Sequence, residues 1–150
     1  MVNERGVSGT AVHHVLIARV GTLACAIPVE HVVETMRPLP IEPLGHDSDY
    51  VRGVAVIRGA PTIVIDTASL LGDVGKPSAG ARSRFVVVRA GARTAALIVD
   101  EVREVRQIPA AELGALPPLA RAAGGGTIQA IGAVDQGLLV VLEAAKLVTA

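Results

Sequence analysis

Asp66 has the surroundings that come nearest to a catalytic pattern in this sequence. It is followed by a hydroxyl residue in the segment Ile65-Asp-Thr-Ala68. Two such carboxylates, one from each of two related lobes, can share a proton and act as acid and base. The comparable stretch of the second half, Glu143-Ala-Ala145, has no hydroxyl residue after its acid. Because aspartate is a common N-cap of helices, we interpret Asp66 as a capping or solvated residue.

Two further patterns also fail as ligand sites. The segment Gly72-Asp-Val-Gly-Lys-Pro-Ser78 lacks the first glycine of a phosphate-binding loop, and Pro77 removes an amide beside the lysine, so we interpret it as a linker. The four histidines have no spacing to cysteine or carboxylate ligands that indicates zinc. They are His13, His14, His31 and His46.

The single cysteine does not change this conclusion. Cys25 lies in an apolar run and is expected to be a buried small hydrophobe rather than a nucleophile. The sequence therefore predicts no enzyme, no metal site and no cofactor.

Composition excludes several classes of partner. Basic and acidic residues number 14 each, and Tyr50 and Phe85 are the two aromatic residues, whereas a nucleic-acid binder needs a basic surface and often stacking rings. No stretch reaches the roughly 18 apolar residues of a membrane helix, so no membrane insertion is expected. The first residues lack an apolar signal core, which favours a cytoplasmic protein.

We expect a disordered tail over 1–12 and a single domain over 13–150.

The chain contains an internal duplication. The segment 14–34 matches the segment 84–104 without a gap, at the one offset that brings Arg19 onto Arg89. The other identical pairs in this register are Gly21 and Gly91, Ala26 and Ala96, Val29 and Val99, Val32 and Val102, and Glu34 and Glu104. A repeat of this length indicates two similar lobes rather than a solenoid.

A second sequence similarity, here called the second echo, lies near the end of each half. Its offset is slightly longer than that of the first similarity. Thr62-Ile-Val-Ile-Asp66 resembles Leu139-Val-Val-Leu-Glu143, which aligns the two acids, and Gly53-Val-Ala-Val56 resembles Gly132-Ala-Val134. We therefore expect one lobe at about 14–72 and the other at about 84–149. Each lobe would be only marginally stable alone, so the two should share an interface and fold as one unit.

Short apolar runs punctuated by turn residues predict an all-β fold with short helices. Five strands are expected in each repeat, which favours two small β-barrels. The expected strands cover 15–20, 23–28, 32–36, 53–57, 62–66, 84–89, 93–99, 102–108, 128–134 and 138–142. A helix of one turn is expected at 68–71 and a short one at 143–149.

Two stretches resemble the signatures of the CheW family of chemotaxis coupling proteins. The first runs from Tyr50 to Gly59 and continues through Ile63-Val-Ile-Asp66; the second is Ala95-Ala-Leu-Ile-Val-Asp-Glu-Val102. The resemblance covers nearly the whole chain. It implies two five-stranded SH3-like β-barrel lobes and a non-catalytic adaptor that joins a CheA-type histidine kinase to the cytoplasmic tips of methyl-accepting chemoreceptors.

The same resemblance implies a set of partner-binding residues. It places Val32, Glu34 and Gly53 on the side that docks the kinase regulatory domain, with Gly53 allowing close approach of a partner backbone. Arg58 matches an arginine of the family that takes part in signalling complexes, and its planar fork suits a partner carboxylate. Gly53→Glu is expected to weaken kinase binding while leaving the thermal melt nearly unchanged.

Two other functions stay open from the sequence. One is a retropepsin-like aspartic protease dimer that uses Asp66 from each chain. The other is the same adaptor fold serving a pathway outside chemotaxis, such as surface motility or gene regulation.

Overall fold

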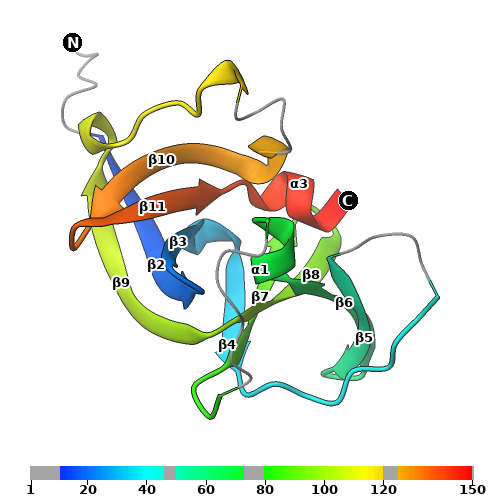
Figure 1. Cartoon of the computed structure of the whole chain (residues 1–150). Coiled ribbons are helices and arrows are strands. Elements are labelled where there is room, and N and C mark those ends of the chain that lie inside the picture. The colour runs from blue at the N-terminus through cyan, green and yellow to red at the C-terminus, as the bar shows by residue number, and fades with distance from the viewer. Residues whose placement is uncertain (1–10, 46–49, 73–79, 120–124, 150) are drawn as a thin grey trace.

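The computed structural model describes residues 11–45, 50–72, 80–119 and 125–149. Most of the tail expected over 1–12 lies outside these ranges, and Val12 already belongs to a strand. The described residues form two five-stranded mixed sheets, here called sheet I and sheet II, with short helices where they meet (Figure 1).

Sheet I has the strand order β10-β11-β3-β2-β9. Its strands are β10 (Ile128–Val134), β11 (Gly137–Leu142), β3 (Leu23–Pro28), β2 (Val12–Val20) and β9 (Glu101–Pro109). Sheet II has the order β4-β7-β8-β6-β5. Its strands are β4 (Val32–Met36), β7 (Arg84–Ala90), β8 (Arg93–Val99), β6 (Ala60–Asp66) and β5 (Val51–Ile57).

Each sheet takes strands from both repeats, because the third strand of each repeat pairs with the first strand of the other repeat. A 3-10 turn, η2 (Val29–His31), follows β3 and sends β4 to pair with β7, the first strand of the other repeat. Reciprocally, β9 pairs with β2. The expectation that each lobe is one contiguous repeat, 14–72 or 84–149, is therefore wrong.

Asp100 joins the two repeats where β8 leads into β9. Its backbone nitrogen donates to the oxygen of Arg19 at 2.9 Å. Its buried carboxylate accepts from the nitrogen of Gly21 at 2.7 Å. The end of β8 is thus hydrogen-bonded to the turn of the β2–β3 hairpin.

The duplication is confirmed at the level of strand register. The hairpin pair Val15 with Pro28 corresponds to Phe85 with Ile98. In the parallel pairings, Ile63 with Ala95 corresponds to Val140 with Cys25. Both offsets found in the sequence, that of the first echo and that of the second, therefore hold in the structure.

One detail of the second echo is wrong. A bulge follows Val51 in β5 and Ile128 in β10, two positions related by the offset that aligns the acids of the second echo. That register equates Gly53 with Ala130, not with Gly132.

The central strands read as continuous apolar runs because both of their faces are buried. In β2, Val15 and Ile17 point into a cluster enclosed by sheet I, whereas Leu16 and Ala18 join a cluster shared by both sheets. Sheet II encloses its own cluster around Phe85. Since every strand of a sheet contributes to the enclosed cluster, each sheet curls around it as a small barrel, which confirms the expected fold class.

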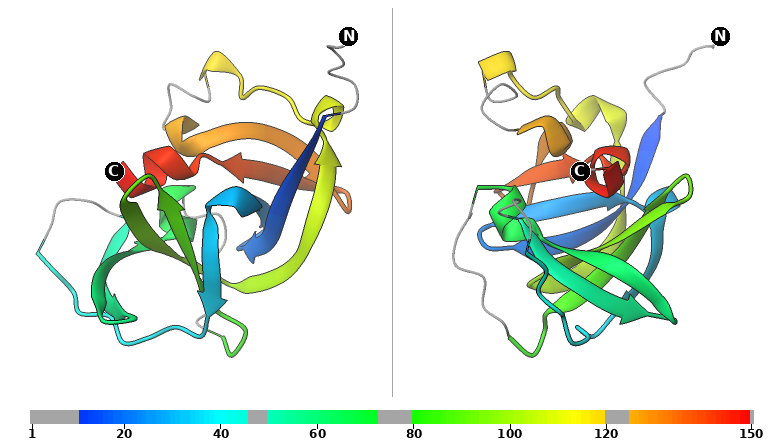
Figure 2. Two further views of the ribbon diagram at one scale, coloured as in Figure 1. Left: turned by 180° about the vertical axis from the view of Figure 1, so that it is seen from behind. Right: turned by 90° about the vertical axis from the view of Figure 1, so that its right-hand side faces the viewer.

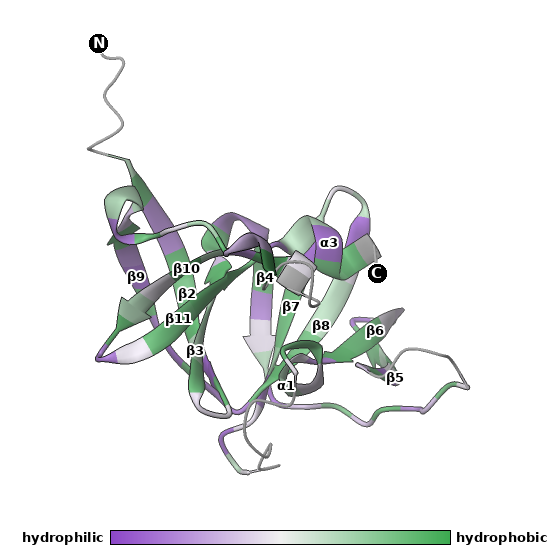
Figure 3. Cartoon of the chain, turned by 45° about the horizontal axis from the view of Figure 1, so that its top comes forward, coloured by the Kyte–Doolittle hydropathy of each residue, from purple (hydrophilic) through white to green (hydrophobic). Residues whose placement is uncertain are grey.

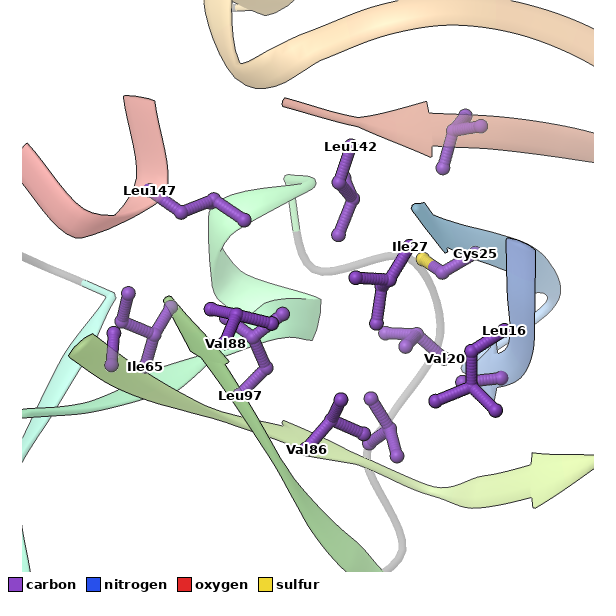
Figure 4. Packing of buried hydrophobic residues seen from close by; sticks show 14 of the residues in the cluster. Leu16, Val20, Cys25, Ile27, Ile65, Val86, Val88, Leu97, Leu142 and Leu147 are labelled. Atoms are coloured by element: carbon purple, nitrogen blue, oxygen red, sulfur yellow. The ribbon is translucent and has the colours of Figure 1, made fainter. Parts of the chain in front are cut away.

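The shared cluster is the largest of the three and holds the sheets together. Figure 4 shows Ile27 and Leu142 of sheet I converging with Val88 and Leu97 of sheet II. In Figure 3, β7, β8 and β11 are mostly hydrophobic, whereas the edge strand β9 carries hydrophilic stretches.

Short helices close the junction between the sheets. These are α1 (Thr67–Leu70), α3 (Ala144–Thr149) and η4 (Gly125–Thr127). The 3-10 helix η3 (Ala110–Glu112) lies away from the junction, beside the start of β2 (Figure 1). Leu147 of α3 is 2% exposed and belongs to the shared cluster, so α3 packs across the junction (Figure 2). None of the helices in the described part of the chain is long and apolar enough to cross a membrane.

The shared cluster predicts cooperative unfolding of both sheets. Leu97 is fully buried there, so Leu97→Ala should lower the free energy of unfolding by about 2–5 kcal/mol. Amide hydrogen exchange should accelerate in β3 and β11 as well as in β7 and β8. Val105→Ala, at a side chain 62% exposed, should change stability by less than about 0.5 kcal/mol. Loss of protection in sheet II alone would contradict this prediction.

Candidate functional site

Arg58 and Glu34, both expected to bind partners, form a two-point ion pair. The Nε of Arg58 donates to Oε2 of Glu34 at 2.9 Å, and NH2 donates to Oε1 at 2.7 Å. The Arg58 side chain is 77% exposed and that of Glu34 is 23% exposed. The carboxylate that fills the fork of Arg58 is therefore in the same chain.

The β5–β6 turn places Arg58 at the hairpin tip. Arg58 and Gly59 have φ angles of 52° and 81°, a backbone typical of tight hairpin turns that match strand twist. A left-handed conformation is uncommon for an arginine and costs about 1–2 kcal/mol. The bidentate contact with Glu34 offsets part of this cost.

The pair joins the two edges of sheet II. Glu34 lies on β4, one edge strand, and Arg58 follows β5, the other edge strand. We call this contact between Arg58 and Glu34 the clasp, because it bridges the two edge strands of the barrel. It also fixes the position of an exposed guanidinium.

Protonation of Glu34 is coupled to this contact. The hydrogen bond from Arg58, together with its positive charge, holds the pKa of Glu34 below its usual value. The same partner raises the pKa of Arg58. The pair is therefore ionised at neutral pH.

The second repeat has a modified version of this clasp. Glu104 on β9 corresponds to Glu34, and Asp135 in the β10–β11 turn, with φ 49°, corresponds to Arg58. Two acids cannot pair, and Arg106 lies between them instead. Its NH2 is 2.6 Å from Oε2 of Glu104 and 3.9 Å from Oδ2 of Asp135.

Val32 is half-buried and packs against the cluster shared by both sheets. It lies two residues before Glu34, with a β-bulge between them. Its side chain therefore supports β4 from within, and its partner-binding role stays a prediction.

Gly53 has a structural role that the sequence did not reveal. It is buried, and the nitrogen of its neighbour Val54 donates to the oxygen of Glu42 at 2.9 Å. A Cβ at Gly53 would overlap that carbonyl oxygen and lie 2.8 Å from its carbon. The backbone that approaches closely is thus the chain's own. The expectation that Gly53→Glu would leave the melt nearly unchanged is wrong.

Asp66 is a helix cap, as the sequence indicated. It is the N-cap of α1, and its Oδ1 accepts from the nitrogen of Ser69 at 3.4 Å. Its Oδ2 is 3.2 Å from NH1 of Arg52. Both oxygens are therefore engaged in structural contacts.

Cys25 and the histidines form no catalytic or metal centre in the described residues. Burial raises the pKa of the Cys25 thiol to about 12, with a smaller contribution from the charge of Asp100, so the thiol stays protonated. The described residues include no group of three or more His, Cys, Asp and Glu side chains that could hold a metal ion. His46 lies outside the described residues.

Comparison with known proteins assigns this chain to a family. The CheW-like domain family matches residues 14–150. The chain belongs to the CheW-like domain family. CheW scaffolding proteins are non-catalytic.

One sequence relative and one solved structure resemble this chain. The chain is 34% identical over 100 residues to Protein FrzA of Myxococcus xanthus, a match that spans 67% of this chain and 61% of FrzA. The scaffolding protein TtCheW from Thermoanaerobacter tengcongensis has the same fold. The TM-score is 0.78 at 21% identity, covering 89% of this chain and 85% of TtCheW.

Sequence reasoning missed the apolar surface beside the clasp of this CheW-like chain. On the outward face of sheet II, Val56 is 64% exposed and Ile63 is 40% exposed. The pairs Val54 with Ile63 and Val56 with Pro61 place these side chains on one face. Alternation in the hairpin was the available signal, but β-branched residues at outward positions are equally compatible with a core.

Gly53 provides a stability prediction. Gly53→Ala should lower the free energy of unfolding by about 2 kcal/mol or more, because its φ of 147° is nearly restricted to glycine and the new Cβ meets backbone. Gly45→Ala is the matched control, since a Cβ there meets nothing within 4 Å. Urea unfolding of both variants checks this, and equal stability would contradict the structural role.

The clasp provides a pH prediction. Arg58→Ala should raise the pKa of Glu34 toward its usual value, measured by carboxyl carbon shifts in an NMR titration. Because folding lowers this pKa, the pair stabilises the fold above the ordinary glutamate pKa. That contribution is lost as the pH falls through the lowered value. Arg93→Ala, at the exposed first residue of β8, should leave the titration of Glu34 unchanged.

Proposed function

We propose that this CheW-like protein is an adaptor that couples chemoreceptors to a CheA-type histidine kinase in chemotaxis signalling. The observation that carries the proposal is the clasp between Arg58 and Glu34, set beside an exposed apolar face. A rigid charged tip next to apolar surface is the composition of a protein-docking site.

The apolar part of the proposed docking surface has a defined shape. Val54 and Val56 of β5, with Leu39 and Pro40 of the preceding segment, line a hollow of about 300 Å³. Val33, 45% exposed, lies on β4 beside Glu34. Burial of these side chains by a partner would supply hydrophobic stabilisation around the charged pair.

The clasp changes how Arg58 acts in this proposal. Its Nε and NH2 groups are engaged by Glu34, which leaves NH1 to donate to a partner. Because the side chain is already held in one orientation, a partner loses less entropy in ordering it. Arg58 and Glu34 then act as one unit rather than as two independent contacts.

The proposed partners are the kinase regulatory domain and the cytoplasmic tip of a methyl-accepting chemoreceptor, and the proposed location is accordingly the cytoplasm. Val32 and Glu34 belong to the proposed kinase-facing side. Gly53 contributes indirectly, because it lets the segment around Glu42 lie against β5 and complete that side.

A second candidate is the same adaptor role in a signalling pathway outside chemotaxis. The likeness to Protein FrzA, 34% identical over 67% of this chain, supports a chemosensory-type adaptor without specifying chemotaxis. The two candidates share the docking surface and differ in the kinase and receptor that bind there.

The adaptor proposal predicts a binding defect without unfolding. Arg58→Ala should weaken binding of the kinase regulatory domain or the receptor-tip fragment by about 2 kcal/mol or more, about 30-fold in Kd. Arg58→Lys should recover part of this, because it keeps the charge but loses the fork. Isothermal titration calorimetry with each purified fragment measures the effect.

The control for this experiment is Arg93→Ala. Arg93 is also exposed and close to a hairpin turn of sheet II, so its removal tests for general charge effects. Wild-type affinity of Arg58→Ala for both fragments would overturn the proposal. Binding only to fragments from a pathway outside chemotaxis would establish the second candidate.

A further inference from the structure

Each sheet has a hollow at the end where its two parallel strands finish. In sheet II these strands are β6 and β8, and the hollow measures about 270 Å³. In sheet I they are β11 and β3, and the hollow measures about 410 Å³. The two hollows are counterparts in the duplicated fold.

The residues that line the hollows correspond to one another at the two offsets of the duplication. The pairs are Arg52 and Gln129, Asp66 and Glu143, Ala68 and Ala145, Ser83 and His13, Ile98 and Pro28, and Asp100 and Glu30. The two sites therefore share a backbone frame but differ in side-chain chemistry.

Asp66 and Glu143 occupy the same place in their two hollows. The nitrogen of Asp66 donates to the oxygen of Tyr50 at 2.7 Å, and that of Glu143 donates to the oxygen of Thr127 at 2.8 Å. Asp66 is the last residue of β6 and Glu143 directly follows the last residue of β11, and a short helix begins at the next residue in each case. A difference between the two sites thus comes from the partners of the acid, not from its position.

In sheet II a guanidinium of the chain itself meets this acid. NH1 of Arg52 lies 3.2 Å from Oδ2 of Asp66. The counterpart of Arg52 is Gln129, which has no charge to offer Glu143. Glu143 instead lies 3.8 Å from Nζ of Lys146 on the exposed rim, where such a pair contributes little.

A second acidic residue also lines the hollow of sheet I. Glu30 lines it and forms no ion pair within the described part of the chain. Two acidic residues therefore line one polar hollow, and the position equivalent to Arg52 carries Gln129 instead of an arginine.

We propose that the hollow of sheet I, lined by Glu30, Gln129 and Glu143, binds an arginine side chain of a partner protein. The guest guanidinium takes the position that Arg52 holds in sheet II. This surface belongs to a different sheet from the clasp of Arg58, so the proposal does not depend on the docking surface described above.

The remaining lining favours a planar organic cation. His13, His14 and His31 also line the hollow, and a guanidinium stacks on flat rings better than an ammonium does. Nδ1 of His31 is held 3.1 Å from the oxygen of Arg89, which fixes that ring. The described side chains do not converge into a metal-binding group, so a bare divalent cation fits the hollow less well.

The test is an NMR titration of the full ¹⁵N-labelled chain with an acetylated, amidated Gly-Arg-Gly peptide. We expect saturable shifts at the amides of His13, Glu30, Gln129 and Glu143. The lysine peptide should bind about fivefold more weakly, and the citrulline peptide, which keeps the shape but not the charge, should give no shifts.

Two variants and a control sharpen the result. Gln129→Arg supplies the guanidinium from within and should weaken peptide binding by about tenfold or more. Glu143→Gln keeps the backbone contact but removes the charge and should weaken binding about fivefold. Glu112→Gln, at an exposed acid of η3, should leave binding unchanged.

Four outcomes would overturn the proposal. They are unchanged binding in both hollow variants, equal shifts with the citrulline peptide, equal weakening by Glu112→Gln, and a response of the hollow to Zn²⁺ alone. Should Gln129→Arg fail to fold, as judged by amide spectra outside the hollow, Glu143→Gln decides the question.

Discussion

The exchange of strands between the two repeats is the constraint on which the rest of the structure depends. Because β4 pairs with β7 and β9 pairs with β2, neither repeat can complete a sheet without the other. The apolar faces left by this exchange meet in one shared cluster. Both barrels, the helices at their junction and the surfaces they present are therefore parts of a single cooperative unit.

The sequence predicted the local elements well because their signals are local. Matching Arg19 with Arg89 revealed the repeat, and Arg58-Gly59 between β-branched runs indicated the hairpin tip. The exchange was not predictable, since the pattern of β4 is equally compatible with pairing inside its own repeat. Only the packing of the whole chain decides whether β4 pairs with β2, the first strand of its own repeat, or with β7, the first strand of the other repeat.

The candidate site shows the same division. Glu34 and Arg58 were both selected from the sequence, but nothing in their spacing indicates that they bind each other. Gly53 was interpreted as space for a partner, whereas the segment at Glu42 already fills that space. The exposed apolar face at Val56 was missed because burial is a property of the folded chain.

The reciprocal exchange also bears on how the two halves differ. Two separate copies of a single repeat would have the strands needed for the same pair of sheets, and in such a homodimer every substitution would appear twice. Joining the copies in one chain removes that symmetry. One position can then carry Arg58 while its counterpart carries Asp135, and one hollow can keep Arg52 while the other has Gln129. A single fused polypeptide thus offers two unlike faces from one ancestral plan, which a symmetric dimer cannot do.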